Sequence, residues 1–200
     1  MEFDTLSVAI LAGGKSTRMG TDKGLFPFRG VPLVAYILRQ IEGLGLETFI
    51  VTNERESYRQ FDAPLLPDVL PDIGSLGGIY SACVYAKGAW VLPLACDMPF
   101  INLPLFRNMM ELANSFHAVV PRLRNGVSEP FRSLFAKSCV LEIRRTIESG
   151  ERRASAFLTR LKVRYIGEME IKRFDPSLHS FLNVNSPNDL AFAENAESFS

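Results

Sequence analysis

The chain has 200 residues, and 47% of them are hydrophobic, which is enough for one compact three-layer domain over residues 1–200. Lysine plus arginine equals aspartate plus glutamate, 22 against 22, so no net charge draws the protein to nucleic acid or to an anionic membrane. Any anion that it binds must therefore be held by a local site.

The sequence shows no clear signal for secretion, membrane insertion or a cysteine-based metal or redox site. The opening MEFDTLSVAILAGG places acidic residues before a short apolar run and does not fit a secretory signal. No apolar segment approaches the ~20 residues that span a bilayer. Cys83, Cys96 and Cys139 are odd in number, far apart and without a Cys-x-x-Cys pair that would suggest a zinc or redox site. We expect three reduced, buried cysteines in a cytoplasmic protein.

The first half of the chain alternates apolar runs of strand length with segments of helical period, which is typical of a parallel sheet covered on both faces. A buried strand over Leu6–Leu11 is predicted to stop at Gly13-Gly14. Apolar residues at helical spacing then predict a helix that ends near Gly43 and Gly45, with its buried face on Val34, Ile37, Leu38 and Ile41. The next elements are a strand over Thr48–Thr52, a helix over Gly77–Lys87 with Gly88 as its stop, and a mid-sheet strand over Trp90–Cys96.

The second half predicts further elements of the same kinds. They are a helix over Leu105–Ala113 after Pro104, a strand over His117–Pro121, a helix through Val140, Ile143 and Ile147 closed by Gly150, a shorter helix over Ala154–Leu161, a strand around Val163 and Tyr165, and a last helix capped by Ser186. Arg132–Phe135 fits either a short strand or a helix start. The expected fold class is α/β, a three-layer α/β/α sandwich with a mostly parallel, Rossmann-like central sheet.

The loop after the first strand has the composition of a polyanion site. Leu11–Lys23 reads LAGGKSTRMGTDK, in which glycines allow backbone N–H groups to converge on phosphate oxygens while Arg18 and Lys23 supply neutralising charge. The alternative is an ordinary exposed loop with solvated cations. A Walker loop is excluded because Ala9 stands where its first glycine would be, and no Gly-x-Gly-x-x-Gly occurs.

Asp97 stands at the carboxyl end of a strand that is otherwise apolar. Ligands of open α/β sheets bind outside these strand ends, and a carboxylate there suits Mg²⁺, which fills its other positions with water and substrate phosphate. The alternative is a helix cap or an Asx turn before Pro99.

Leu11–Lys23 closely resembles the Leu-Ala-Gly-Gly-x-Ser-x-Arg-Met-Gly-x-Asp-Lys signature of the molybdenum cofactor guanylyltransferases, within the wider nucleotidyltransferase fold. The resemblance continues over nearly the whole chain, through Asp68, the turn Gly74–Gly78, Asp97, Glu129-Pro130, Gly150–Arg153 and Phe181–Pro187. Two positions depart from it, because Ser75 stands where the family usually has proline and Pro130-Phe131-Arg132 replaces Pro-Leu-His on the acceptor side.

The resemblance implies a reaction in which GMP from GTP is joined to the phosphate of molybdenum-bound molybdopterin and pyrophosphate is released. It implies Mg²⁺ on Asp97, and nucleotide contacts from Leu11, Ala12, Gly13, Gly14, Lys23, Asn53, Asp68 and Asp97. Arg18 and Lys23 are expected at the leaving pyrophosphate, with Arg18, Lys23 and Asp97 as the catalytic set. Transient contacts with cofactor biosynthesis proteins or molybdoenzyme chaperones are also expected.

Several of these positions have simpler alternatives. Asn53 and Asp68 are also the residues of ordinary strand-end and proline turns. Asn183 and Asn185 are two apart, so on an extended segment both amides face one side and suit a phosphate or a metal-bound water, but they could equally be turn residues before Ser186. His117 and His179 fall outside every motif and are expected to be structural.

Three rival functions are retained. Two share the fold: a molybdopterin cytidylyltransferase that uses CTP, and a sugar-1-phosphate nucleotidyltransferase. The third belongs to a different class, a noncatalytic GTP-binding adaptor that docks onto a cofactor-insertion partner. Intact Arg18, Lys23 and Asp97 argue against the adaptor, because a module that only binds has no need of all three.

Overall fold

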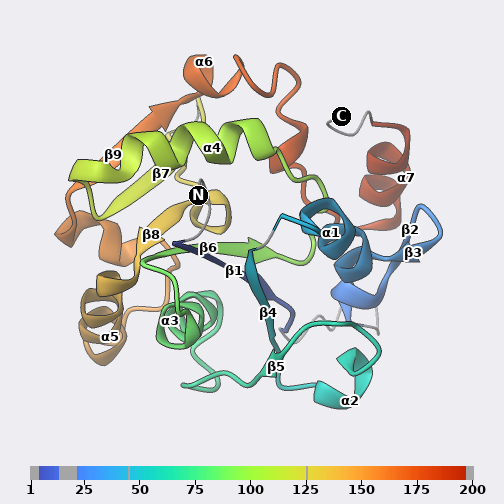
Figure 1. Ribbon diagram of the computed structural model, residues 1–200, viewed down its shortest axis with the longest axis horizontal. Coiled ribbons are helices and arrows are strands. Elements are labelled where there is room, and N and C mark those ends of the chain that lie inside the picture. The colour runs from blue at the N-terminus through green and yellow to red at the C-terminus, as the bar shows by residue number, and fades with distance from the viewer. Residues whose placement is uncertain (1–4, 14–21, 45, 125, 197–200) are drawn as a thin grey trace.

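A seven-stranded sheet forms the centre of the protein in the computed structural model, which describes residues 5–13, 22–44, 46–124 and 126–196 (Figure 1). Its strand order is β5-β4-β1-β6-β8-β7-β9. Pairing is parallel except at β8, which runs antiparallel to both of its neighbours. The strands are β1 (Leu6–Leu11), β4 (Glu47–Val51), β5 (Leu65–Leu66), β6 (Trp90–Ala95), β7 (Ala118–Arg122), β8 (Leu134–Ala136) and β9 (Val163–Gly167), and a separate hairpin joins β2 (Pro27–Phe28) to β3 (Val31–Pro32).

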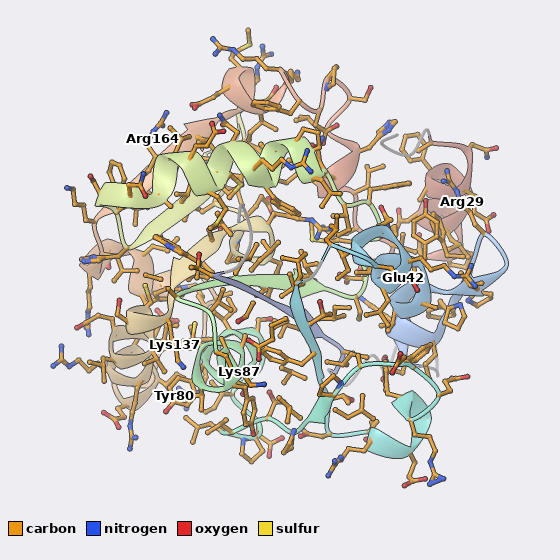
Figure 2. All side chains as sticks on the ribbon, viewed as in Figure 1. Arg29, Glu42, Tyr80, Lys87, Lys137 and Arg164 are labelled. Atoms are coloured by element: carbon orange, nitrogen blue, oxygen red, sulfur yellow. The ribbon has the colours of Figure 1, made fainter. Side chains whose placement is uncertain are left out.

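Helices cover both faces of this sheet (Figure 1). They are α1 (Leu33–Ile41), α2 (Arg55–Tyr58), α3 (Ser75–Tyr85), α4 (Leu103–Leu112), α5 (Val140–Glu148), α6 (Glu168–Ile171) and α7 (Pro187–Asn195). One apolar cluster packs α1 and α4 on the sheet, and a second packs α3 and α5 on the opposite face. Figure 2 shows side chains between the sheet and the helices on each of its faces. The predicted three-layer α/β/α sandwich with a mostly parallel sheet is confirmed.

Most predicted elements are confirmed to within two residues at each end, and β6 is the middle strand as expected. Gly88 was wrongly interpreted as a helix stop, because α3 already ends at Tyr85 with Ala86 as its cap. A Cβ at Gly88 would lie 2.5 Å from the Thr5 carbonyl oxygen, so the residue serves a close backbone approach. The predicted helix Ala154–Leu161 is a 3-10 helix over Ala156–Arg160.

The undecided segment Arg132–Phe135 divides between two elements. A 3-10 helix covers Pro130–Arg132, and β8 begins at Leu134. The sequence signal was ambiguous because all four residues of Arg132–Phe135 are buried, so no alternation of buried and exposed positions distinguishes a strand from a helix.

The chain reverses its direction of travel across the sheet at β1. The connection through α1 places β4 on one side of β1, and the later connection through α3 places β6 on the other side. A crevice forms at such a switch point, outside the carboxyl ends of the strands. Ligand binding is therefore expected where β1 and β6 end.

Hydrogen bonds fix both ends of the carboxyl-terminal helix α7. Ser186 caps its start by accepting the Asp189 N–H, as the sequence predicted. The Arg29 guanidinium donates to the carbonyl oxygens of Glu194 and Ala196 while it lies against three aromatic rings, those of Phe28, Tyr36 and Phe100 (Arg29 is labelled in Figure 2). The carboxyl-terminal end of α7 is thereby held against the hairpin of β2 and β3.

As predicted, Cys83, Cys96 and Cys139 are all buried and unpaired. Burial raises the pKa of the Cys139 thiol to about 12, so this side chain stays protonated. Among the helices of the described residues, none is long and apolar enough to cross a bilayer.

Candidate functional site

Gly13 and Asp97 leave the sheet side by side. Leu11 is paired with Ala95 in the parallel register, and the Cys96 N–H donates to the Leu11 carbonyl oxygen at 3.3 Å. Gly13 and Asp97 each lie two residues beyond that pair. Gly13 is exposed, and among the described residues no atom lies within 4 Å of the position that a Cβ would occupy there. The predicted glycine turn and carboxylate therefore lie beside each other at the edge of the sheet where the switch point predicts a ligand crevice.

Lys23 enters this crevice from the loop after β1. Asp22 caps the 3-10 helix Lys23–Leu25 by accepting the Gly24 N–H at 3.0 Å, and Gly24 is buried against the Tyr58 ring, where a side chain would collide. The Lys23 ammonium lies 3.0 Å from Asp97 Oδ2 and also donates to Asn185 Oδ1. Three segments that are distant in sequence thus converge on one cation.

The segment around Asn185 lies beside Asp97 through its backbone. The Val184 N–H donates to the Asp97 carbonyl oxygen at 2.7 Å, and the Val184 side chain is buried. The flanking Asn183 and Asn185 are both exposed, which is the alternation predicted for an extended segment. Asn185 reaches Lys23, whereas Asn183 has no contact with Lys23 or Asp97 among the described residues.

Asn53 and Asp68 meet at the end of the neighbouring strand β4. The Asn53 side chain accepts the Asp68 N–H at 3.0 Å and donates to Asp68 Oδ2 at 3.2 Å. Burial raises the pKa of the Asp68 carboxyl, while hydrogen bonds from Ser81 and Asn53 oppose that rise. The sequence reasoning missed Ser81, a buried hydroxyl on α3 that lies 3.3 Å from Asp68 Oδ1. Its signal was a polar residue at a buried helical position.

The glycine segment Gly74–Gly78 is a helix start and not the turn that was expected. Gly74 has a φ of 74°, and α3 begins at Ser75. A Cβ at Gly78 would lie 3.2 Å from a Leu11 methyl carbon, and one at Gly77 would lie 2.8 Å from Ile73 Cβ. These glycines therefore let α3 pack closely against β1 and the loop before the helix.

Some sequence-predicted residues cannot be placed. Gly14 and Arg18 lie outside the described residues, and their roles stay predictions. The two histidines have structural positions, as expected: His117 precedes β7 and accepts the Lys162 N–H, and His179 packs against the Phe100 ring. Since β7 and β6 run in the same direction, His117 lies at the opposite edge of the sheet from Asp97.

The donor set at Asp97 fits a magnesium ion that is shared with a nucleotide. Asp97 Oδ2 accepts from Lys23, while Oδ1 has no hydrogen bond within the described residues, and the side chain is 19% exposed. No group of three acidic, histidine or cysteine side chains gathers in the described part of the chain. A single carboxylate completed by water and substrate phosphates is a normal protein environment for Mg²⁺.

A cavity of about 490 Å³ lies on the same edge of the sheet. It is lined by the ends of β7 and β9 and by α6, through Arg122, Leu123, Arg124, Gly126, Tyr165, Gly167, Glu168 and Met169. Val91 and Ala118 both pair with Phe135, so Ala95 and Arg122 stand at one level in the sheet. The Arg122 guanidinium stacks 3.5 Å from the centre of the Tyr165 ring. The cavity is thus a neighbour of the crevice, two strand spacings or about 10 Å away.

Comparisons with known proteins agree with this geometry. The chain is 32% identical over 191 residues to a probable molybdenum cofactor guanylyltransferase of Peptoclostridium acidaminophilum, a match that covers 92% of this chain and 86% of that protein. It is 34% identical over 186 residues to the molybdenum cofactor guanylyltransferase of Syntrophotalea carbinolica, covering 92% and 88% of the two chains.

Among solved structures, the molybdopterin-guanine dinucleotide biosynthesis protein A of Archaeoglobus fulgidus superposes with a TM-score of 0.81 at 27% identity, covering 94% of this chain and 96% of that one. The family model described as MobA-like NTP transferase domain matches residues 8–165. This chain therefore belongs to the family of MobA-like NTP transferase domains.

Proposed function

We propose that this protein is a molybdenum cofactor guanylyltransferase, which transfers GMP from GTP to the phosphate of molybdenum-bound molybdopterin and releases pyrophosphate. The observation that carries the proposal is the meeting of Lys23, Asp97 and Asn185 beside the exposed Gly13 backbone at the switch point of the sheet. Relatives named for this activity match nearly the whole chain.

The proposed reaction does not require the protein to transfer a proton. An oxygen of the acceptor phosphate attacks the α-phosphorus of GTP, and the bond from that phosphorus to the bridging oxygen of the β-phosphate breaks. The acceptor is already an anion at neutral pH, so no general base is required. The positions of His117 and His179, one at the far edge of the sheet and one packed on Phe100, agree with this.

The side chains and backbone of the site align the acceptor phosphate with the triphosphate and neutralise the negative charge of both. The backbone of Leu11–Gly13 borders the triphosphate, and Lys23 neutralises charge on the leaving pyrophosphate. Mg²⁺ held by Asp97 would supply further positive charge to the phosphates. Asn185 orients Lys23 and presents its amide to the acceptor side, where Asn183 lies exposed on the same segment. Arg18 retains its predicted place at the pyrophosphate.

The base is assigned to the edge formed by Asn53 and Asp68. Their amide and carboxylate oxygens can accept hydrogen bonds from the N–H groups of guanine, which presents a ring N–H beside its amino group. Cytosine offers only an amino group, so unpaired acceptors would disfavour CTP. The pairing of Asn53 with Asp68, reinforced by Ser81, supports a fixed recognition edge.

The acceptor side extends toward the cavity at β7 and β9. An acceptor phosphate beside Asp97 would leave the rest of the ligand free to reach this cavity, where Arg122 and Tyr165 form a stacked cationic and aromatic wall. The three buried, unpaired thiols support a cytoplasmic location, where cysteines remain reduced.

The test is a pyrophosphate-release assay on purified protein with Mg²⁺ and molybdenum-bound molybdopterin. GTP should support release, with CTP and ATP at least roughly tenfold poorer, and sugar 1-phosphates should not replace the pterin acceptor. A preference for CTP would identify a cytidylyltransferase. Binding of GTP without Mg²⁺-dependent transfer would identify an adaptor and refute the proposal.

A further inference from the structure

Arg132 is a fully buried arginine behind the proposed site. It ends the 3-10 helix Pro130–Arg132, which packs against both β6 and β7, and none of its surface is exposed. Its Nε donates to the Ser180 carbonyl oxygen at 2.9 Å, and its Nη2 donates to the Met98 carbonyl oxygen. One side chain therefore cross-links two loops that are far apart in sequence.

Those two loops carry the groups that meet at Lys23. Met98 directly follows Asp97, and Ser180 lies in the 3-10 helix His179–Phe181, a few residues before Asn185. The Val184 N–H bonded to the Asp97 carbonyl oxygen is a second link between the same segments. Arg132 and this backbone bond thus hold the two segments together from the inner side, and Lys23 bridges them on the outer side.

The burial of this cation is energetically unfavourable. Removal from water lowers the pKa of the Arg132 guanidinium to about 9, while the negative charges of Asp97, Glu129 and Asp175 oppose that change. Its Nη1 is buried without a hydrogen-bond partner among the described residues. An apolar side chain of similar volume would fill this space at less cost, so packing alone does not account for an arginine here.

The acidic residues around Arg132 are themselves ordered. Asp175 is buried and accepts hydrogen bonds from the Ser180 N–H at 2.9 Å and the Ser180 hydroxyl at 2.6 Å, so the carbonyl to which Arg132 donates has a fixed position. On the opposite side, the guanidinium faces the loop that begins with Asp97. The cation is therefore held on two ordered carbonyl oxygens, close enough to Asp97 for the negative charge of that carboxylate to act on it.

We propose that Arg132 is a positioning residue, which locks the Asp97 and Asn185 segments into one arrangement and places a buried positive charge behind the Asp97 carboxylate. Asp97 is thereby kept in the orientation in which it meets Lys23. The inference deepens the proposed function, since it concerns the same site, but the links themselves do not depend on which nucleotide or acceptor binds.

The test compares Arg132→Lys, which keeps the charge and loses the two-armed link, with Arg132→Met, which loses both. Ser7→Ala is the matched control, because Ser7 is equally buried and its hydroxyl joins Glu47 and Gly88 at the opposite edge of the sheet from Asp97. Two quantities are measured on the full chain: hydrogen exchange of the Val184 amide relative to amides of α5, and kcat against KM for GTP.

We expect Arg132→Lys to speed Val184 exchange and to lower kcat roughly tenfold, with KM for GTP changed less than about threefold, and Arg132→Met to lower kcat further. Ser7→Ala should lower the melting temperature and leave Val184 exchange and kcat at wild-type values. If Arg132→Met does not fold, Arg132→Lys decides alone.

Wild-type Val184 exchange in Arg132→Lys, or a kcat loss no larger than that of Ser7→Ala at a matched loss of melting temperature, would overturn the inference. The exchange measurement needs no substrate. A wild-type protein without guanylyl transfer would therefore refute the proposed function while the exchange result still decided the role of Arg132.

Discussion

The ammonium group of Lys23 lies 3.0 Å from the carboxylate of Asp97, a residue 74 positions later in the chain. Both side chains are partly exposed, at 24% and 19%, so the ion pair contributes at most about 1 kcal/mol to the free energy of unfolding. Its larger value is geometric, because it places a cation and a potential metal ligand at the end of two adjacent strands. Substitutions at this pair are therefore expected to change turnover far more than they change the free energy of unfolding.

Replacing Lys23 by alanine should lower turnover about a hundredfold, since loss of one transition-state charge contact typically costs about 3 kcal/mol. The melting temperature should change little. Lys87→Ala is the control, because Lys87 forms an ion pair with Glu47 at 3.6 Å, at the opposite edge of the sheet from Asp97. Full guanylyl transfer by Lys23→Ala in a purified assay would show that the role given to Lys23 is wrong.

Asp97→Asn preserves the size of the side chain and its ability to accept from Lys23, but removes the charge that would hold Mg²⁺. We expect kcat to fall roughly a hundredfold or more and the Mg²⁺ concentration for half-maximal rate to rise. Titration of Mg²⁺ at saturating GTP measures both. Asp62→Asn, at an exposed aspartate before β5, should behave as wild type. An unaltered Mg²⁺ titration in Asp97→Asn would contradict the metal assignment.

Two glycine substitutions should have opposite effects. The Cβ of Gly13→Ala would meet no atom of the described residues within 4 Å, so stability should be nearly unchanged while kcat/KM for GTP falls through collision with the phosphates. Gly77→Ala places its Cβ 2.8 Å from Ile73 Cβ and 3.2 Å from the Leu70 carbonyl oxygen, and should destabilise by about 1–3 kcal/mol. Urea unfolding and steady-state kinetics distinguish the two. Wild-type kcat/KM in Gly13→Ala would exclude phosphates from that backbone.

Asp68→Asn and Asn53→Ala should weaken the choice of base more than they weaken catalysis. Each removes or rearranges acceptors assigned to guanine, so the ratio of kcat/KM for GTP to that for CTP should fall about tenfold. Competition between the two nucleotides in one reaction measures this ratio directly. Ser57→Ala, at an exposed position on α2, is the control. If the ratio of kcat/KM for GTP to that for CTP were unchanged in both variants, Asn53 and Asp68 would not be the residues that recognise the base.

The start of α7 should loosen in acid. Hydrogen bonds from the Ser186 side chain and the Asn185 N–H lower the pKa of Asp189 below its ordinary 3.8. A carboxylate with a lowered folded-state pKa contributes stability that is present above the unfolded pKa and is lost as pH falls through the folded value. The stability difference between wild type and Asp189→Asn should therefore be constant near neutral pH and shrink below about pH 4.

Urea unfolding of both proteins between pH 3 and pH 7 measures this difference. If the difference in the free energy of unfolding grew as the pH fell, the ionised form of Asp189 would not be the stabilising one. Because Asp189 holds the Asn185 backbone at 3.0 Å, the same variant should also weaken the Asn185 contact with Lys23, seen as a lower kcat at neutral pH.

Local patterns were sufficient to predict most of the fold. Leu6–Leu11 and Trp90–Ala95 are apolar on both faces, which only a central parallel strand requires, and Ser186 with Pro187 marks a helix start by capping chemistry alone. The candidate residues at strand ends could be predicted for the same reason, since Gly13, Asn53 and Asp97 each follow directly on a recognisable strand.

Contacts between distant segments could not be read from the chain. Nothing near Lys23 predicts Asn185 as its partner, and nothing near Asp68 predicts Ser81, because such pairs depend on how helices and loops pack after the sheet has formed. Gly88 was misinterpreted for the same reason: its constraint comes from Thr5, on another segment. The sequence by itself determined which residues end the strands, through periodicity and turn chemistry. Only the tertiary structure decided which of them meet, and that a buried Arg132 lies behind them, because burial and long-range hydrogen bonds exist only in the packed chain.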